Sequence, residues 1–173
     1  MMCLSGIRER YRYWRWLVAL VLALLFIVLT PRGAIAEDYT KEALINTDFS
    51  GRDLRDSQFT KANLFHSDLS HTNLQGVSFF AANLEAANLE GADLRYATLD
   101  TARLTKANLT NAILEGAFAF NTKFDGATIT GADFTDVDLR EDAQRLLCAV
   151  ASGRNPVTGR NTRETLHCED FDT

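Results

Sequence analysis

The sequence predicts an all-β solenoid, because a large apolar residue returns at every fifth position between Leu44 and Leu139. Only Ala119 interrupts this series of leucine, phenylalanine and isoleucine residues, and a small residue stands two positions before most of them. Steps of five spread side chains around a helix and alternate the two faces of a flat strand, so neither element can bury the pattern. A chain that bends once per repeat and stacks coil on coil can bury it.

One triplet recurs through the periodic region. Its clearest copies are Ala62-Asn63-Leu64, Ala82-Asn83-Leu84, Ala87-Asn88-Leu89, Ala92-Asp93-Leu94, Ala107-Asn108-Leu109 and Ala132-Asp133-Phe134. These copies resemble the A(D/N)LXX motif of the pentapeptide-repeat family, and the resemblance spans the periodic region without insertion. It implies a right-handed quadrilateral β-helix with four pentapeptides per coil and about five coils.

Two further features predict how the coils turn and how the first one ends. Gly91 and Gly131 stand two positions after a central apolar residue, where a turn needs a positive φ. Arg52 occupies a slot that is otherwise held by a small residue, and its side chain is too long for the shaft. We therefore expect the first coil to be irregular or open at its end.

Residues 1–36 are predicted to be a signal peptide. Four arginines precede an uninterrupted apolar run from Trp16 to Thr30, and Ala34-Ile35-Ala36 supplies a small-x-small cleavage pattern directly before Glu37. The alternative is an uncleaved membrane anchor, although this run is shorter than the ~18 residues expected of a membrane span. Cleavage after Ala36 would make Glu37 the first residue of the mature chain.

The predicted mature chain, residues 37–173, is acidic. The segment before it carries five arginines and one glutamate, so 13 basic and 22 acidic side chains remain, a net charge of −9. This balance disfavours nucleic acid and anionic membrane surfaces as partners. We expect no nucleic-acid binding, and membrane contact only through the signal segment before its cleavage.

The five-residue period ends near residue 141. We therefore expect a β-helix over residues 37–141 and a helical cap over residues 142–173. Apolar residues between Glu141 and Val150 recur at helical spacing, with acidic residues in the first turn. A turn and a second short helix follow, and together they are predicted to cover the last coil.

Cys148 and Cys168 are the only cysteines of the predicted mature chain. Two cysteines in an exported protein favour a disulfide, and closing a loop of about twenty residues is worth roughly 3 kcal/mol. The alternative is a redox-active pair whose reduction releases the cap. The structural and the regulatory role both remain open at this point.

The C-terminal region carries a second resemblance. The run Ala151–Gly159, followed by Thr162-Arg163 and Cys168, resembles the C-terminal extension of pentapeptide-repeat proteins from the thylakoid lumen of cyanobacteria and chloroplasts. This resemblance implies export to the thylakoid lumen, with the periplasm as the next alternative. Because the leader resembles a bacterial signal peptide, it also suggests a cyanobacterial source.

Phe80, Phe118 and Phe120 form a candidate partner-binding surface, because a four-sided coil places all three on one side of the column. Ile113 is expected near the corner of this side. Two structural interpretations compete with a binding role. The backbone shifts so that Phe118 or Phe120 fills the space left by Ala119, or the C-terminal segment folds over both rings.

The turn at residues 155–159 is a second candidate for partner recognition. Asn155, Pro156, Thr158 and Gly159 are the residues proposed to contact the partner. They belong to the run that resembles the extension of the lumenal proteins, and they lie outside the periodic region.

Residues with the potential for chemistry are few. His66 and His71 stand near Asp68, but the spacing brings together no third or fourth metal ligand, so we interpret both as solvated surface residues. Asp136 and Asp138 are interpreted as outward-facing bend residues, and a calcium site there has no further support. We predict no catalytic residue, no metal and no cofactor.

The sequence therefore favours a non-catalytic interaction or assembly protein whose partner is another lumenal protein. One alternative is a lumenal protein that is regulated by reduction of the Cys148–Cys168 pair. Another is a DNA mimic that binds topoisomerase, as some pentapeptide-repeat proteins do, but the signal peptide would direct this chain away from DNA.

Overall fold

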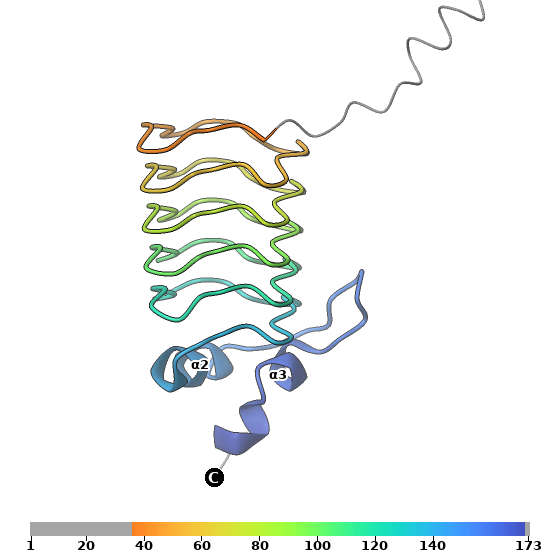
Figure 1. Ribbon diagram of the computed structural model, residues 1–173. Coiled ribbons are helices and arrows are strands. Elements are labelled where there is room, and N and C mark those ends of the chain that lie inside the picture. The colour runs from red at the N-terminus through yellow and green to blue at the C-terminus, as the bar shows by residue number, and fades with distance from the viewer. Residues whose placement is uncertain (1–35, 172–173) are drawn as a thin grey trace, which may run out of the picture. The chain divides into compact units, whose positions relative to one another are not determined.

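The computed structural model describes residues 36–171, which form a stack of coils followed by short helices (Figure 1). Of the predicted signal peptide, only Ala36 is among the described residues. Ala34 of the cleavage pattern lies outside them. Ala36 and Glu37 are the first two residues described, and both are exposed. None of the helices among the described residues is long and apolar enough to cross a membrane.

Residues twenty positions apart pair with each other along the whole stack. Single parallel bridges run from Asp38↔Gln58 at one end to Phe118↔Asp138 at the other, and each side of a coil contributes one bridge residue in place of a long strand. Lys123 shows how such a residue pairs. Its N–H donates to the Ala102 carbonyl at 3.0 Å, and its carbonyl accepts from the Leu104 N–H at 2.7 Å.

The shaft is filled by the residues that the periodicity selects. From Phe59 to Leu114 the central residues are completely buried, and the small residues between them are almost as inaccessible. Full burial of one leucine side chain stabilises the fold by about 2 kcal/mol. The alternation of one large and one small inward side chain therefore accounts for the main stabilising term of the column.

The corners adopt the left-handed backbone that the glycines predict. Gly91 and Gly131 have φ values of 62° and 71°, and equivalent corners are left-handed even where the residue is Lys61 or His71. Asparagine side chains reinforce the stack on the sides. The Asn83 Nδ2 donates to the Asn63 Oδ1 at 2.9 Å, one coil away.

The first coil begins earlier than the apolar series suggests. Tyr39 occupies the position five residues before Leu44, and its ring stacks on Phe59 with a centroid distance of 4.7 Å. The coil pairs regularly with the next one, so the expectation of an irregular coil is wrong, whereas the alternative of an open end stays a prediction. Arg52 is exposed, with its guanidinium 5.4 Å from the centre of the Phe49 ring.

Three short helices follow the coils. α2 spans Glu141–Cys148, α3 spans Thr162–Thr165, and the 3-10 helix η1 spans Cys168–Phe171. A hairpin of residues 154–161, closed by an antiparallel bridge between its two ends, connects α2 to α3 and projects at the side of the column (Figure 1). Residues 141–171 are called the C-terminal segment below.

The expected helical stripe of α2 is only partly buried. The helix ends at Cys148, before Val150, and Leu147 and Cys148 are its buried residues. Leu146 and Val150 are 40% and 56% exposed. The helix therefore packs mainly through Leu147 and Cys148, with Ala143 partly buried, and Leu146 lies outside this contact.

Candidate binding surfaces

Three aromatic side chains lie exposed on one side of the column. Phe80 is 40% exposed, Phe118 is 54% exposed and Phe120 is 48% exposed, and we call these three residues the aromatic surface. Bridges place Phe118 in line with Thr98 and Ser78 of the two preceding coils. Equivalent positions on this side are therefore occupied by polar residues in the earlier coils and by a phenylalanine in the later one.

The two interpretations that would hide these rings are wrong. Ala119 remains inward and fully buried, and neither Phe118 nor Phe120 enters the shaft beside it. The C-terminal segment leaves about half of each ring exposed. The backbone does change locally, because the Asn121 N–H donates to the Asp100 Oδ1 at 3.0 Å, where a regular corner would use a backbone carbonyl.

Ile113 was expected to be near the corner of this side, but it does not contribute to the aromatic surface. It is only 6% exposed and lies in the bridge stack between Asp93 and Asp133. The hairpin contacts this corner through Asn155 and Arg160, and it therefore shields Ile113 from solvent.

Asn155 is an anchor, which contradicts its predicted role as a partner contact. It is 1% exposed, and its Nδ2 donates to the carbonyls of Asn111, Ala112 and Gly131 at 3.1, 3.3 and 2.9 Å. Its Oδ1 accepts from the backbone N–H groups of residues 157 and 158 at 2.9 and 3.0 Å. A side chain with every polar atom engaged in this way cannot reach a partner.

The other turn residues remain at the surface. Pro156 is exposed, and Thr158 and Gly159 are half-buried. The most exposed large apolar side chain of the described residues is Val157, which is not among the contact residues predicted from the sequence. Its place between Pro156 and Thr158 at the tip of a polar turn was the signal that could have identified it.

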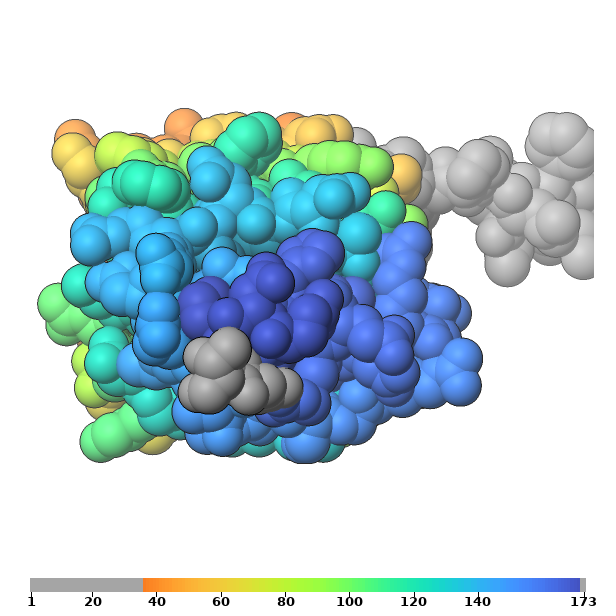
Figure 2. Space-filling view, turned by 90° about the horizontal axis from the view of Figure 1, so that it is seen from below, coloured from red at the N-terminus to blue at the C-terminus, as the bar shows by residue number. Residues whose placement is uncertain are grey.

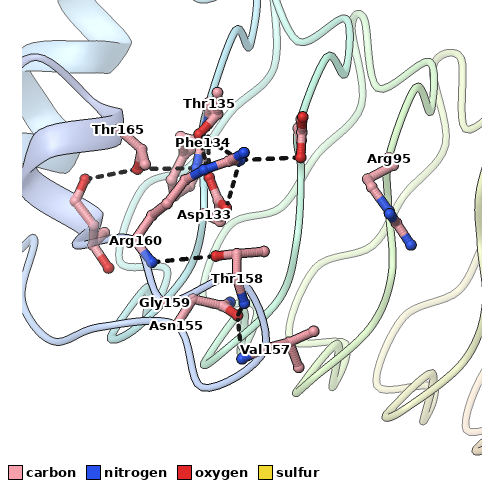
Figure 3. A network of polar contacts seen from close by, with 12 residues as sticks. Arg95, Asp133, Phe134, Thr135, Asn155, Val157, Thr158, Gly159, Arg160 and Thr165 are labelled. Atoms are coloured by element: carbon pink, nitrogen blue, oxygen red, sulfur yellow. Dashed lines mark hydrogen bonds and ion pairs between the residues drawn. The ribbon is translucent and has the colours of Figure 1, made fainter.

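Arg160 fastens the second strand of the hairpin to the column (Figure 3). Its guanidinium Nη1 lies 3.0 Å from Glu115, 3.2 Å from the Asp133 Oδ2 and 3.1 Å from the Thr135 Oγ1. Asp133 is fully buried. Burial alone would raise the pKa of Asp133, but hydrogen bonds from Thr135 and Thr158 and the charge of Arg160 outweigh burial and lower it.

Asp133→Asn should weaken this attachment in a pH-dependent way. Because the folded-state pKa of Asp133 is lowered, its carboxylate stabilises the fold above the unfolded pKa of about 3.9, and this contribution is lost as the pH falls further. We expect the variant to unfold at lower urea concentration than the parent at pH 7, by about 1–2 kcal/mol. The difference should narrow as the pH falls below about 4 and should close below the lowered folded-state pKa of Asp133. A gap that is the same at pH 7 and pH 3 would contradict the role of the charge.

Other titratable residues form no reactive group. His66 and His71 are exposed, as are Asp136 and Asp138, and no cluster of three potential ligands occurs among residues 36–171. Burial, followed by the hydrogen bond to Glu37, raises the pKa of Tyr39 to about 12. This phenol therefore stays protonated and serves packing.

Comparison with known proteins places the column in a family. The model for pentapeptide repeats matches residues 44–79, 82–118 and 102–140. A curated relative, the chloroplastic thylakoid lumenal 15 kDa protein 1 of Arabidopsis thaliana, is 60% identical over 48 residues. That match covers 28% of this chain and 21% of the relative, so the chain spans about a fifth of that protein's length.

Solved structures extend the similarity over most of the chain. A pentapeptide repeat protein from the Arabidopsis thaliana thylakoid lumen is 48% identical, with a TM-score of 0.74, covering 75% of this chain and 90% of that one. A pentapeptide repeat protein from Nostoc is 30% identical, with a TM-score of 0.52, covering 61% of this chain and 86% of that one. These neighbours imply that the coils form a right-handed quadrilateral β-helix, and the Arabidopsis thaliana structure confirms the resemblance to thylakoid-lumen proteins. The chain belongs to the pentapeptide-repeat family.

Proposed function

We propose that this protein is a non-catalytic interaction or assembly factor of the thylakoid lumen that binds another lumenal protein through its aromatic surface. The observation that carries the proposal is the exposure of Phe80, Phe118 and Phe120 on one side of a column whose other sides are mainly polar. Exposed apolar groups gathered on a stiff surface are typical of protein-binding sites.

The architecture supports presentation of a surface in preference to chemistry. Large and small side chains fill the shaft, so a substrate has no interior site, and a stack of coils gives flat and rigid sides. The proposal takes the column, residues 37–141, as about five coils. Residues 142–173 then act as a disulfide-linked helical cap on the last coil.

The location rests on two independent supports. The leader has the composition of a signal peptide with cleavage before Glu37, and the two Arabidopsis thaliana relatives described above are thylakoid lumen proteins. Export to the thylakoid lumen satisfies both. The periplasm is the alternative that satisfies only the first.

Phe118→Asp tests the aromatic surface. We expect it to weaken capture of the lumenal partner at least tenfold, because it places a charge at the centre of an apolar contact. The stability should change by less than about 0.5 kcal/mol, since Phe118 is exposed. The measurement is quantitative capture from lumen extract on immobilised protein, with bound proteins identified by mass.

Ile45→Asp is the matched control for this test. Ile45 is 47% exposed and also follows a central residue, but it lies on a different side of the column. Capture should survive in this variant. Equal capture by the parent, Phe118→Asp and Phe80→Asp proteins would exclude the aromatic surface as the binding site.

A second function is supported by the pairing of Cys148 with Cys168, whose sulfurs are bonded at 2.06 Å. Reduction would separate α2 from η1 and loosen the C-terminal segment, which would make the protein a redox-regulated binding factor. The redox potential of the pair separates this regulatory role from a structural one.

A further inference from the structure

A groove lies where the last coil meets α2, at the end of the column that Figure 2 views from below. Its volume is about 250 Å³. Its lining residues are Phe120, Asn121, Thr122, Lys123, Phe124, Asp125, Arg140, Asp142, Ala143 and Leu146.

The column edge in this groove has unpaired backbone groups. Among the described residues, the Phe124 N–H finds no acceptor and the Thr122 carbonyl finds no donor. In the coil above, the equivalent Leu104 N–H and Ala102 carbonyl are both satisfied by Lys123. One residue in extended conformation, placed below Lys123, would satisfy the two open groups in the same way.

The position of α2 explains why this edge is open. The chain would have to continue with another bent side after Leu139, but it enters a helix at Glu141 instead. The residue twenty positions after Lys123 is Ala143, which lies within α2 and cannot form the parallel bridge. Elsewhere the C-terminal segment does pair with the last coil, because the Gly131 N–H donates to the Ser152 carbonyl at 2.8 Å.

The charged side chains on the rim of the groove favour one order of charges in a bound peptide. Arg140 and Asp142 form an ion pair at 3.1 Å, which leaves Lys123 and Asp125 as the rim charges without a partner among the described residues. They flank Phe124, with the cation before it and the anion after it. A strand added in parallel below them would place its own side chains directly beneath each charge.

We propose that this groove binds an extended peptide segment of another protein as one additional parallel rung, with the order acidic, large apolar, basic. The acidic residue exchanges two backbone hydrogen bonds with Thr122 and Phe124, and its carboxylate lies beneath Lys123. The apolar side chain enters the groove between Phe124 and Leu146, and the basic residue lies beneath Asp125. This inference rests on the proposed binding role and adds a second contact to it. The groove shares Phe120 with the aromatic surface, but Phe118 does not line it.

Two blocked peptides of identical composition test the order. One carries the core Asp-Leu-Lys and the other carries Lys-Leu-Asp, and each has a fluorescent label for anisotropy titration against the full chain. We expect the first peptide to bind at least tenfold more tightly. Methylation of the backbone nitrogen of its Asp should also cost about tenfold, because it removes the donor to the Thr122 carbonyl.

Variants of the protein assign the binding to this groove. Leu146→Asp should abolish binding of the Asp-Leu-Lys peptide, whereas Val150→Asp, an exposed change just beyond the same helix, should not alter it. The double change Lys123→Asp and Asp125→Lys should reverse the preference between the two peptides. Phe118→Asp should leave peptide binding intact, so that failure of the aromatic surface and failure of the groove are distinguishable.

Several results would overturn the proposal. They are equal affinity for the two peptides, no effect of N-methylation, unchanged binding to the Leu146→Asp variant, and no binding at millimolar peptide. A concentration-dependent dimer that Leu146→Asp dissociates and that the peptide does not displace would assign the groove to a second copy of the chain.

Discussion

Asn155→Ala is expected to detach the hairpin from the column and to lower the free energy of unfolding by about 3 kcal/mol. The change removes three donated and two accepted hydrogen bonds at a site that is closed to water. The carbonyl of Gly131 and the N–H groups of residues 157 and 158 lose the partners that this side chain provides. Urea unfolding gives the total effect, and amide hydrogen exchange at residues 155–162 shows whether the loss is local.

The Asn155→Asp variant tests the hydrogen bonds that this side chain donates separately from those that it accepts. A carboxylate can still accept from residues 157 and 158, but it would face three carbonyl oxygens as a buried charge. We expect this variant to be less stable than Asn155→Ala. Pro156→Ala, at an exposed neighbour, should stay within about 0.5 kcal/mol of the parent. Equal stability of the Asn155→Asp and parent proteins would contradict the anchor role.

Replacing both cysteines by serine should lower the free energy of unfolding by about 3 kcal/mol. This is the contribution that loop-closure entropy makes for a disulfide with a sequence separation of 20. The effect should be confined to the C-terminal segment, because the parallel bridges of the column join residues 38 to 138 and include no residue of that segment. Exchange of amides in α2 and η1 should accelerate strongly. Amides near Leu89 and Leu94, at the middle of the column, should keep their protection.

The redox potential of the pair decides between its two roles. A disulfide that stays intact in equilibrium with a dithiol buffer near −300 mV is structural and excludes regulation by the usual thiol systems. A potential near −200 mV, together with loss of partner capture on reduction, would favour the regulatory hypothesis.

The column was predictable because each of its rules is local. Leu94, Ala97 and Gly91 each follow from the position within five residues, and the structure places all three as expected. Tyr39 does not belong to the series of leucine, phenylalanine and isoleucine residues, although its position fits the period. Ala119 was recognised as an exception, but its sequence does not show whether a neighbouring ring moves inward.

The hairpin was less predictable because its contacts are long-range. Asn155 looks like an ordinary turn residue, and its three carbonyl partners lie 24 to 44 positions earlier in the chain. Asp133 likewise matches the repeat motif, and only the fold brings Arg160 to it. The groove depends on the distance between α2 and the last coil, which no periodicity encodes.

The pairing interval of twenty residues also sets the direction in which Phe80 faces relative to Phe118 and to the groove. An insertion of five residues after Asp100 would rotate everything beyond it by a quarter turn, and Phe80 would then face a different direction from Phe118. An insertion of a whole coil would only lengthen the distance along the axis. The column can therefore gain or lose whole coils without changing the directions in which its binding sites face. Any smaller insertion or deletion between two sites alters their relative orientation.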